Sequence, residues 1–268
     1  MRPLVLKFGG ELLDHPDRLG LTAATIGVIA AAGPLVIVHG GGKEIDAALR
    51  AAGIEKRQVD GLRVTDEQTL GVVVAVLAGT INTRFVAALT TSGVPAVGLT
   101  GADAACGLSE PAPPHSTADG RVVDLGRVVV PIAGADMRLL ETLAAGGFEP
   151  VVACIGLGTD GTLFNVNADA FAGHLAARLR ARRLVIAGTT PGVFGGDGTT
   201  ITQLDQPAMA RLLSDGTATA GMMAKLRACD EALANGVDDV VIVDGRSLPA
   251  LAVAANDGTL VAATRIVR

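Results

Sequence analysis

The chain has 268 residues, of which 49% are apolar, and a formal net charge of −5. This length allows one large or two small domains, and the composition is typical of a close-packed α/β enzyme and excludes a disordered chain. With no Trp or Tyr, six Phe and no dense Lys/Arg run, the chain lacks the stacking platforms and basic patches of nucleic-acid-binding proteins. We therefore expect no nucleic-acid partner.

The sequence offers neither a metal site nor a membrane segment. Three cysteines lie far apart: Cys106, Cys154 and Cys229. The four His form no HExxH or HxxxH pair, so we predict buried thiols, no protein-built metal site and a reducing, cytoplasmic location. The charge-free stretch 19–38 is interrupted by Gly33-Pro34, which predicts a helix and a strand instead of a membrane span. Lys7 interrupts the N-terminal apolar run, so no signal peptide is expected.

Two predicted strands near the N-terminus each end in a glycine turn. The first, over 3–8, ends in Lys7-Phe8-Gly9-Gly10 and is followed by a helix over 17–32. The second, Val36-Ile37-Val38, is followed by His39-Gly40-Gly41-Gly42 and a helical pattern. Glycines between a strand and a helix N-terminus let backbone amides approach an anion, which predicts a phosphate site. A tight turn that binds nothing, and a strand-end lysine in solvent, fit the same residues.

Residues 54–65 are predicted to form a short polar hairpin around the turn dipeptide Asp60-Gly61. Arg63 would lie on this flap, where its guanidinium is suited to binding a carboxylate, or else would be a solvated surface charge. Thr65 is the expected N-cap of the long helix that follows, with Gly79 as a candidate break point. The apolar stretch of this helix indicates core or a subunit interface.

The middle of the chain is expected to consist of strands, loops and one helix. Strands are predicted over 94–99, 122–123, 128–132 and 150–155, a loop with an Asp119-Gly120 turn over 107–120, and a helix over 135–145. Residues 156–161 spell GxGxxG. However, the next helix begins too late, near Asn167, and the next strand does not end in the acidic residue that a dinucleotide-binding fingerprint requires. We predict a turn between two strands there.

Asn165, Asn167 and Asp169 stand at alternate positions where a strand gives way to a helix. This alternation would direct the three polar side chains toward one region, although Asn167 could serve only as an N-cap. The remaining elements are predicted to be a helix to Arg182, a strand over 184–187, helices over 205–213 and 221–235, a strand over 239–243, and a short helix and strand to Arg268. Alternating strands and helices predict a parallel sheet with helices on both faces.

Five motifs, in their order along the chain, resemble those of the amino acid kinase family, and within it the N-acetylglutamate kinases of arginine biosynthesis. They are Lys7-Phe8-Gly9-Gly10, His39-Gly40-Gly41-Gly42, Gly61-Leu62-Arg63-Val64-Thr65-Asp66, Asn165-Val166-Asn167-Ala168-Asp169 and Gly221-Met222-Met223-Ala224-Lys225. The resemblance implies a three-layer α/β/α sandwich with an open, mainly parallel central sheet in one continuous domain. Its amino-acid-binding lobe would span 1–170 and its nucleotide-binding lobe 171–268.

The resemblance also implies an activity, ATP-dependent phosphorylation of the γ-carboxylate of N-acetyl-L-glutamate, and a role for each matching residue. By similarity the catalytic residues are Lys7, Lys225 and Asp169. The substrate-binding residues are Gly41, Gly42, Arg63, Asn165 and Asn167, and the phosphate-binding residues are Gly9, Gly10 and Gly40. The nucleotide-binding residues are Gly188, Thr189, Gly192 and Met222, and Mg²⁺ would be carried by the ATP phosphates. The acceptor carboxylate is ionised at neutral pH, so the reaction requires no general base.

Thr189 departs from the family pattern, because an Asp usually stands at this position of the nucleotide pocket. Weak or less selective nucleotide binding is therefore expected. Two alternative functions remain: a carrier-protein-linked aminoadipate kinase of lysine biosynthesis, which the plain Arg63–Asp66 stretch disfavours, and a catalytically weak regulatory relative. Two residues precede the first predicted strand, too few for the N-terminal helix of arginine-inhibited members, so we expect a homodimer that arginine does not inhibit.

Overall fold

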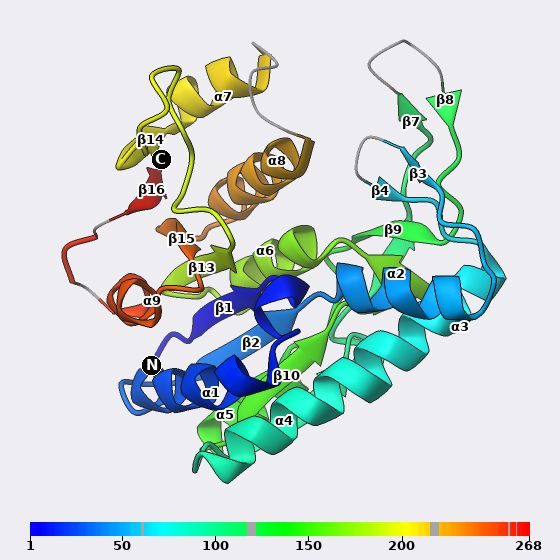
Figure 1. Ribbon diagram of the computed structural model, residues 1–268, viewed down its shortest axis with the longest axis horizontal. Helices are drawn as coiled ribbons and strands as arrows, with labels where there is room; N and C mark the ends of the chain where they lie inside the picture. Colours follow the sequence, from blue (N-terminus) through cyan, green and yellow to red (C-terminus); the bar gives the residue numbers. More distant parts are fainter. Residues whose placement is uncertain (60–61, 117–121, 215–219, 257, 261) are drawn as a thin grey trace.

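The computed structural model describes residues 1–59, 62–116, 122–214, 220–256, 258–260 and 262–268. Its central sheet has the strand order β14-β16-β15-β13-β1-β2-β10-β5 (Figure 1). The strands are β1 (Leu4–Phe8), β2 (Leu35–His39), β5 (Ala96–Thr100), β10 (Glu149–Ala153), β13 (Arg183–Gly188), β14 (Gln203–Asp205), β15 (Val240–Asp244) and β16 (Ala263–Val267).

The strands from β15 to β5 run parallel, so their carboxyl ends lie along one edge of the sheet. Strand β16 is antiparallel to β15, and β14 is parallel to β16. Every residue of β1, β2, β10 and β13 is buried, as expected for parallel strands that are covered on both faces. In open sheets of this kind, ligands bind outside the carboxyl ends of the strands.

Helices cover both faces of the sheet. Helix α1 packs against α4 and α9, whereas on the other face α6 packs against α8, β1 and β13. The helices outside the long segment 67–91 are α1 (Pro16–Ala30), α2 (Gly42–Ala51), α5 (Arg138–Ala145), α6 (Ala168–Arg178), α7 (Gln206–Ser214), α8 (Ala220–Ala234) and α9 (Leu248–Ala255), with short 3₁₀ turns η1 (Gly10–Leu12) and η3 (Asp103–Ala105). This arrangement confirms the predicted α/β/α fold. The three cysteines are buried and free, as predicted.

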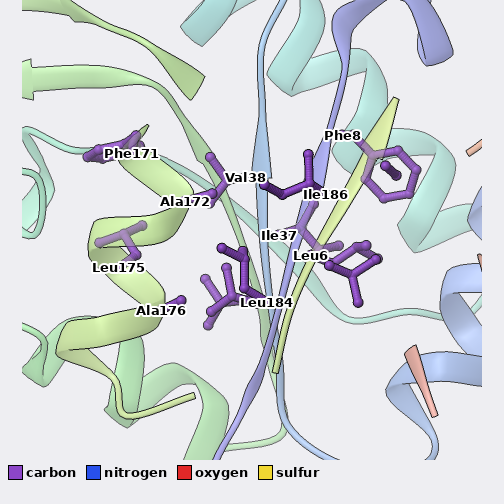
Figure 2. Close-up of a cluster of buried hydrophobic side chains, with 14 of the residues drawn as sticks. Leu6, Phe8, Ile37, Val38, Phe171, Ala172, Leu175, Ala176, Leu184 and Ile186 are labelled. Carbon is purple, nitrogen blue, oxygen red and sulfur yellow. The ribbon is translucent and has the colours of Figure 1, made fainter. Parts of the chain in front are cut away.

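Neighbouring side chains of β1 point to opposite faces of the sheet. Phe8 meets Phe85 of α4, with ring centroids 5.7 Å apart, and Lys7 lies on the face covered by α6. Figure 2 shows the apolar core around the sheet, with four side chains of α6 beside the strands. These are Phe171, Ala172, Leu175 and Ala176. This packing holds the end of β1 and the start of α6 in a fixed relation.

The long helix after the hairpin is continuous from Glu67 to Thr91. It comprises α3 (Glu67–Val74), a π-helical segment η2 (Ala75–Ile81) and α4 (Asn82–Thr91), so a break at Gly79 was the wrong prediction. The predicted N-cap Thr65 was also wrong, because Asp66 accepts the Thr69 amide at 2.8 Å. Of the helices described, this one alone is long and apolar enough to cross a membrane; one side of it packs against β5 and β10.

A smaller sheet continues from the carboxyl end of β10, in the order β11-β12-β9-β6. Its strands are β11 (Ile155–Leu157), β12 (Leu163–Val166), β9 (Val128–Pro131) and β6 (Ser109–Pro111). The GxGxxG stretch joins the antiparallel strands β11 and β12, which confirms the predicted turn.

Two hairpins complete the described part of the fold: β3 (Gln58–Val59) pairs with β4 (Leu62–Arg63), and β7 (His115–Ser116) pairs with β8 (Val122–Val123). The turn dipeptides Asp60-Gly61 and Asp119-Gly120 lie outside the described residues. The helix predicted to reach Arg182 ends at Arg178, and Arg180 then takes a positive φ of 50°.

Candidate active site

A buried carboxylate lies between two lysines at the carboxyl edge of the sheet. Lys7 of β1 places its Nζ 2.6 Å from Oδ1 of Asp169, and Lys225 of α8 places its Nζ 3.1 Å from Oδ2. The side chains of Lys7 and Asp169 are 6% and 7% exposed. With all three groups ionised, this lysine cluster carries a net positive charge in largely dry surroundings, which suits an anionic ligand.

The two lysines keep Asp169 ionised. Burial alone raises the pKa of Asp169, but the charges and hydrogen bonds of Lys7 and then Lys225 outweigh burial, and the pKa lies below its ordinary value. Asp169 stands in the first turn of α6, behind the N-cap Asn167, whose Oδ1 accepts the amides of Asp169 at 2.9 Å and Ala170 at 3.1 Å. The positive end of the helix further favours the carboxylate. A bound anion would therefore meet the side chains of Lys7 and Lys225 at fixed positions.

The two glycine turns meet each other beside the lysine cluster. A Cβ on Gly10 would lie 2.5 Å from the Cα of Gly41, a contact that only glycine permits. Gly40 lies against the start of α6, where a Cβ on it would be 3.3 Å from the Cβ of Ala168. Helix α2 begins at Gly42 without a side-chain cap, so the amides of its first turn are suited to an anion.

His39 ends β2 beneath the second glycine turn and is neutral. It is fully buried, and burial lowers its pKa to about 4. The amide Nδ2 of Asn82 lies 3.0 Å from Nε2 of His39 and donates to the carbonyl oxygen of Val151 at 2.9 Å. Because Nε2 accepts this bond, the proton is assigned to Nδ1, which lies 3.2 Å from the carbonyl oxygen of Gly40. His39 thus fixes the turn without adding charge.

Arg63 is partly buried in the structure. Its side chain is 9% exposed, and its Nη2 donates to Asp46 of α2 and, at 3.4 Å, to the carbonyl oxygen of Gly42. Its Nη1 is buried and has no hydrogen-bond partner among the described residues. A buried cationic nitrogen without a partner is costly unless a ligand satisfies it, and a carboxylate is the ligand that suits it.

Asn165 of β12 is connected to the same hairpin. Its Nδ2 donates to Oγ1 of Thr65 at 3.1 Å, and this hydroxyl donates to the carbonyl oxygen of Arg63 at 3.1 Å. The structure therefore joins Arg63, Asn165 and the second glycine turn in one connected group of polar contacts. These residues are far apart in the sequence.

Two of the residues predicted to bind nucleotide, Gly188 and Thr189, lie at the carboxyl end of β13, close to the lysine cluster. Gly188 ends β13, and a Cβ there would lie 3.6 Å from Cε of Lys225. Thr189 follows, and its carbonyl oxygen accepts a hydrogen bond from Nη2 of Arg246 at 2.7 Å. This turn therefore lies at the carboxyl edge, next to the cationic cluster.

The other two residues predicted to bind nucleotide contribute to packing. Gly192 has a φ of 117°, and Oγ1 of Thr264 occupies the space beside it, accepting the amide of Val193 at 2.8 Å. Met222, in the first turn of α8, packs against the hydrophobic core. Any contact with a nucleotide would be additional to these roles.

Sequence reasoning missed several polar residues that support the site. Asp46 holds Arg63, Asn82 holds His39, and Asp244 with Arg246 holds the turn at Thr189. The Asp244-Gly245 pair offered a signal, because an Asp that ends an apolar strand stands at the carboxyl edge. Within the described ranges, no group of three or more His, Cys, Asp or Glu side chains could hold a metal ion.

The sequence of this chain is similar to those of known proteins. The sequence profile of the amino acid kinase family matches residues 2–244. An acetylglutamate kinase from Novosphingobium aromaticivorans is 40% identical over 255 residues, which cover 91% of this chain and 84% of the relative. One from Sinorhizobium fredii is 38% identical over 252 residues, which cover 92% of this chain and 85% of the relative.

Solved structures agree with the sequence comparison. The N-acetylglutamate synthase from Neisseria gonorrhoeae, in complex with coenzyme A and N-acetyl-glutamate, aligns with a TM-score of 0.83 and 28% sequence identity. The alignment covers 100% of this chain and 59% of that chain. This chain therefore spans less than two thirds of the synthase.

Proposed function

This chain belongs to the amino acid kinase family, and from its site we propose that it transfers the γ-phosphoryl group of ATP to the γ-carboxylate of N-acetyl-L-glutamate. The choice of acceptor is supported by acetylglutamate kinases that are 38% and 40% identical over more than nine tenths of the chain. The observation that carries the proposal is the lysine cluster, in which Asp169 holds Lys7 and Lys225 at the carboxyl edge. As the motif resemblance implies, this reaction would belong to arginine biosynthesis.

The chemistry requires charge and alignment more than proton transfer. The acceptor carboxylate is ionised at neutral pH, so one of its oxygens attacks the γ-phosphorus without a general base. The bond between this phosphorus and the oxygen that bridges to the β-phosphate breaks, and ADP leaves with the electron pair. Negative charge is spread over the phosphoryl oxygens in the transition state, where Lys7 and Lys225 stabilise it. Asp169 pairs with both lysines and holds them in place.

The amino-acid lobe, residues 1–170, would hold the acceptor. Arg63 offers its unpartnered Nη1, which suits the α-carboxylate, and Asn165 lies in the same connected group, which suits the acetamide region. The phosphoryl group would lie between the two glycine turns, whose backbones approach closely. The residues of these turns are Gly9, Gly10, Gly40, Gly41 and Gly42. Asn167 would act by capping α6 and so positioning Asp169.

The nucleotide lobe, residues 171–268, would hold ATP at the turn formed by Gly188 and Thr189. Gly192 and Met222 would support this turn and the start of α8. The one carboxylate of the lysine cluster, Asp169, is already neutralised by two lysines, so the cluster itself does not fit a cation. We propose that Mg²⁺ is carried by the ATP phosphates, where it neutralises part of their charge.

We propose a cytoplasmic homodimer joined through the long helix 67–91. Small side chains recur at every fourth position on its exposed surface: Gly71, Ala75, Gly79, Thr83 and Ala87. Such a surface lets the same helix of a second copy approach closely. Burial of an apolar helix face in a closed two-fold contact would stabilise a dimer. Light scattering tests this, and a monomer at assay concentration would contradict it.

The experiment that tests the activity measures ADP release with four acceptors: N-acetyl-L-glutamate, glutamate, aspartate and carrier-linked aminoadipate. Release with acetylglutamate alone supports the proposal. Release with carrier-linked aminoadipate would instead favour a kinase of lysine biosynthesis. No release with any acceptor, from a folded protein that still binds acetylglutamate by calorimetry, would favour a regulatory relative.

A further inference from the structure

One side chain of α4 contacts both glycine-turn segments. The Nη2 of Arg84 donates to the carbonyl oxygen of Leu13 at 3.0 Å and to Oε1 of Glu44 at 3.0 Å. Leu13 closes the 3₁₀ turn η1, which begins at Gly10 in the first glycine turn. Glu44 stands in the first turn of α2, directly after the second glycine turn. A single guanidinium nitrogen therefore bridges the segments that follow the two turns.

The helix that carries Arg84 also supports the glycine turns by packing. A Cβ on Gly41 would overlap the side chain of Ile81 and lie 2.8 Å from Cδ2 of Leu77. Arg84 is three residues after Ile81 and so lies on the same side of the helix. The π-helical segment Ala75–Ile81 directly precedes α4.

The acidic groups around Arg84 make its charge important. Oδ1 of Asp14 and Oε2 of Glu44 are both buried, and neither has a hydrogen-bond partner in the described part of the chain. Burial, and then the neighbouring Asp14 carboxylate, raises the pKa of Glu44. A second cation, the exposed Lys43, has its Nζ 3.8 Å from Oδ2 of Asp14. Without Arg84, two partly buried acids would face each other across the junction of the turns.

We propose that Arg84 is a positioning residue that sets the separation of the two glycine turns and thereby shapes the cradle for the transferred phosphoryl group. This inference rests on the proposed function, because it assumes that a phosphoryl group lies between the turns. Arg84 does not itself contact the phosphoryl group. It acts by tying Leu13 and Glu44 to the same point on α4, so that the amides of both turns converge.

The test compares Arg84→Ala and Arg84→Lys with Arg50→Ala, which removes a cation from the exposed last turn of α2. Hydrogen exchange of the amides in 9–13 and 40–44 reports the turns independently of activity. In Arg84→Ala we expect exchange in both segments to become roughly tenfold faster, and kcat to fall roughly 10- to 100-fold with both KM values little changed. Arg84→Lys should change the exchange rates and kcat less than Arg84→Ala does. Arg50→Ala should change neither the exchange rates nor kcat.

Each outcome decides the inference. Unchanged exchange in either segment of Arg84→Ala would show that the side chain does not tie the turns together. Faster exchange with an unchanged kcat would show that the tie has no role in positioning the phosphoryl group. If the unaltered protein phosphorylates no acceptor, the proposed function fails, and the exchange measurement still decides whether Arg84 holds the turns. If Arg84→Ala does not fold, Arg84→Lys, in which one ammonium group replaces the forked guanidinium, supplies the same comparison.

Discussion

Arg246 donates a hydrogen bond from its Nη2 to the carbonyl oxygen of Thr189, 2.7 Å away. The same guanidinium pairs with Asp244, with Nε 2.9 Å from Oδ1 and Nη2 2.7 Å from Oδ2. Asp244 lies opposite Gly188 in the register of β13 and β15. The turn at Thr189 is therefore held by Arg246, which follows the neighbouring strand β15, and by Asp244 at the end of that strand, although Thr189 lacks the carboxylate expected at this position.

Replacing Arg246 by Ala should weaken nucleotide binding selectively. Without the hydrogen bond the turn has more conformations to lose on binding, so the KM for ATP should rise roughly 3- to 10-fold, while the KM for acetylglutamate stays constant. Arg138→Ala is the matched control, because Arg138, at the exposed start of α5, forms the same kind of pair with Asp136, two residues earlier. Steady-state kinetics, with each substrate varied in turn, measures both KM values. Equal changes in the two KM values would contradict a selective role of Arg246 in nucleotide binding.

Replacing Lys7 or Lys225 by Ala should lower kcat far more than it raises either KM. Each lysine supplies charge used mainly in the transition state, so we expect losses of roughly 10²–10³-fold. Arg227→Ala is the control, because Arg227 lies on the same helix as Lys225 with its side chain exposed. Single-turnover kinetics with circular dichroism separates lost chemistry from lost folding. A variant with near-normal kcat would remove that lysine from the mechanism.

Replacing Arg63 by Ala should raise the KM for acetylglutamate. Its Nη1 is buried without a partner among the described residues, so losing a charged contact with the α-carboxylate should cost roughly 10- to 100-fold. The KM for ATP should not change. Arg57→Ala is the control, because Arg57 lies beside the same hairpin, with its side chain 57% exposed. Calorimetric titration with acetylglutamate gives an independent measure, and unchanged affinity would assign Arg63 to folding alone.

Local patterns predicted the elements of this fold well, because an apolar strand that ends in glycine is visible in the sequence itself. The predictions failed where the sequence permits two alternative local structures. Thr65 and Asp66 are both good N-caps, and only the structure selects Asp66. At Gly79 the helix widens into a π-turn instead of breaking, because Leu77 and Ile81 on either side are buried against the glycine turn.

The lysine cluster was predicted only through the family resemblance, and the pairs that support the site were not predicted at all. Arg63 meets Asp46 across 17 residues, and Arg84 meets Glu44 across 40. No helix or strand period links residues so far apart. Such pairs form only when α2, the hairpin and α4 have packed together.

Glu149 is a buried carboxyl at the opposite, amino-terminal edge of the sheet. It is 8% exposed, and its Oε2 accepts the amide of Leu35 at 3.0 Å. Burial raises the pKa of Glu149 from 4.5 to about 7, and the Leu35 hydrogen bond offsets only part of this shift. Between these two values the folded state holds a proton that the unfolded state has released. The free energy of unfolding therefore falls as pH rises through this window and is flat above it.

Replacing Glu149 by Gln should remove this pH dependence, because Gln keeps an oxygen for the Leu35 amide but cannot ionise. We expect Glu149→Gln to match the unaltered protein near pH 5 and to be more stable near pH 8, by on the order of 3 kcal/mol. Urea unfolding at several pH values measures this difference. Glu141→Gln, at an exposed position of α5, should show no such gain. If the free energies of unfolding of Glu149→Gln and of the unaltered protein changed with pH in the same way from pH 5 to pH 8, the Glu149 carboxyl would already be ionised throughout. Its burial would then not couple folding to protonation.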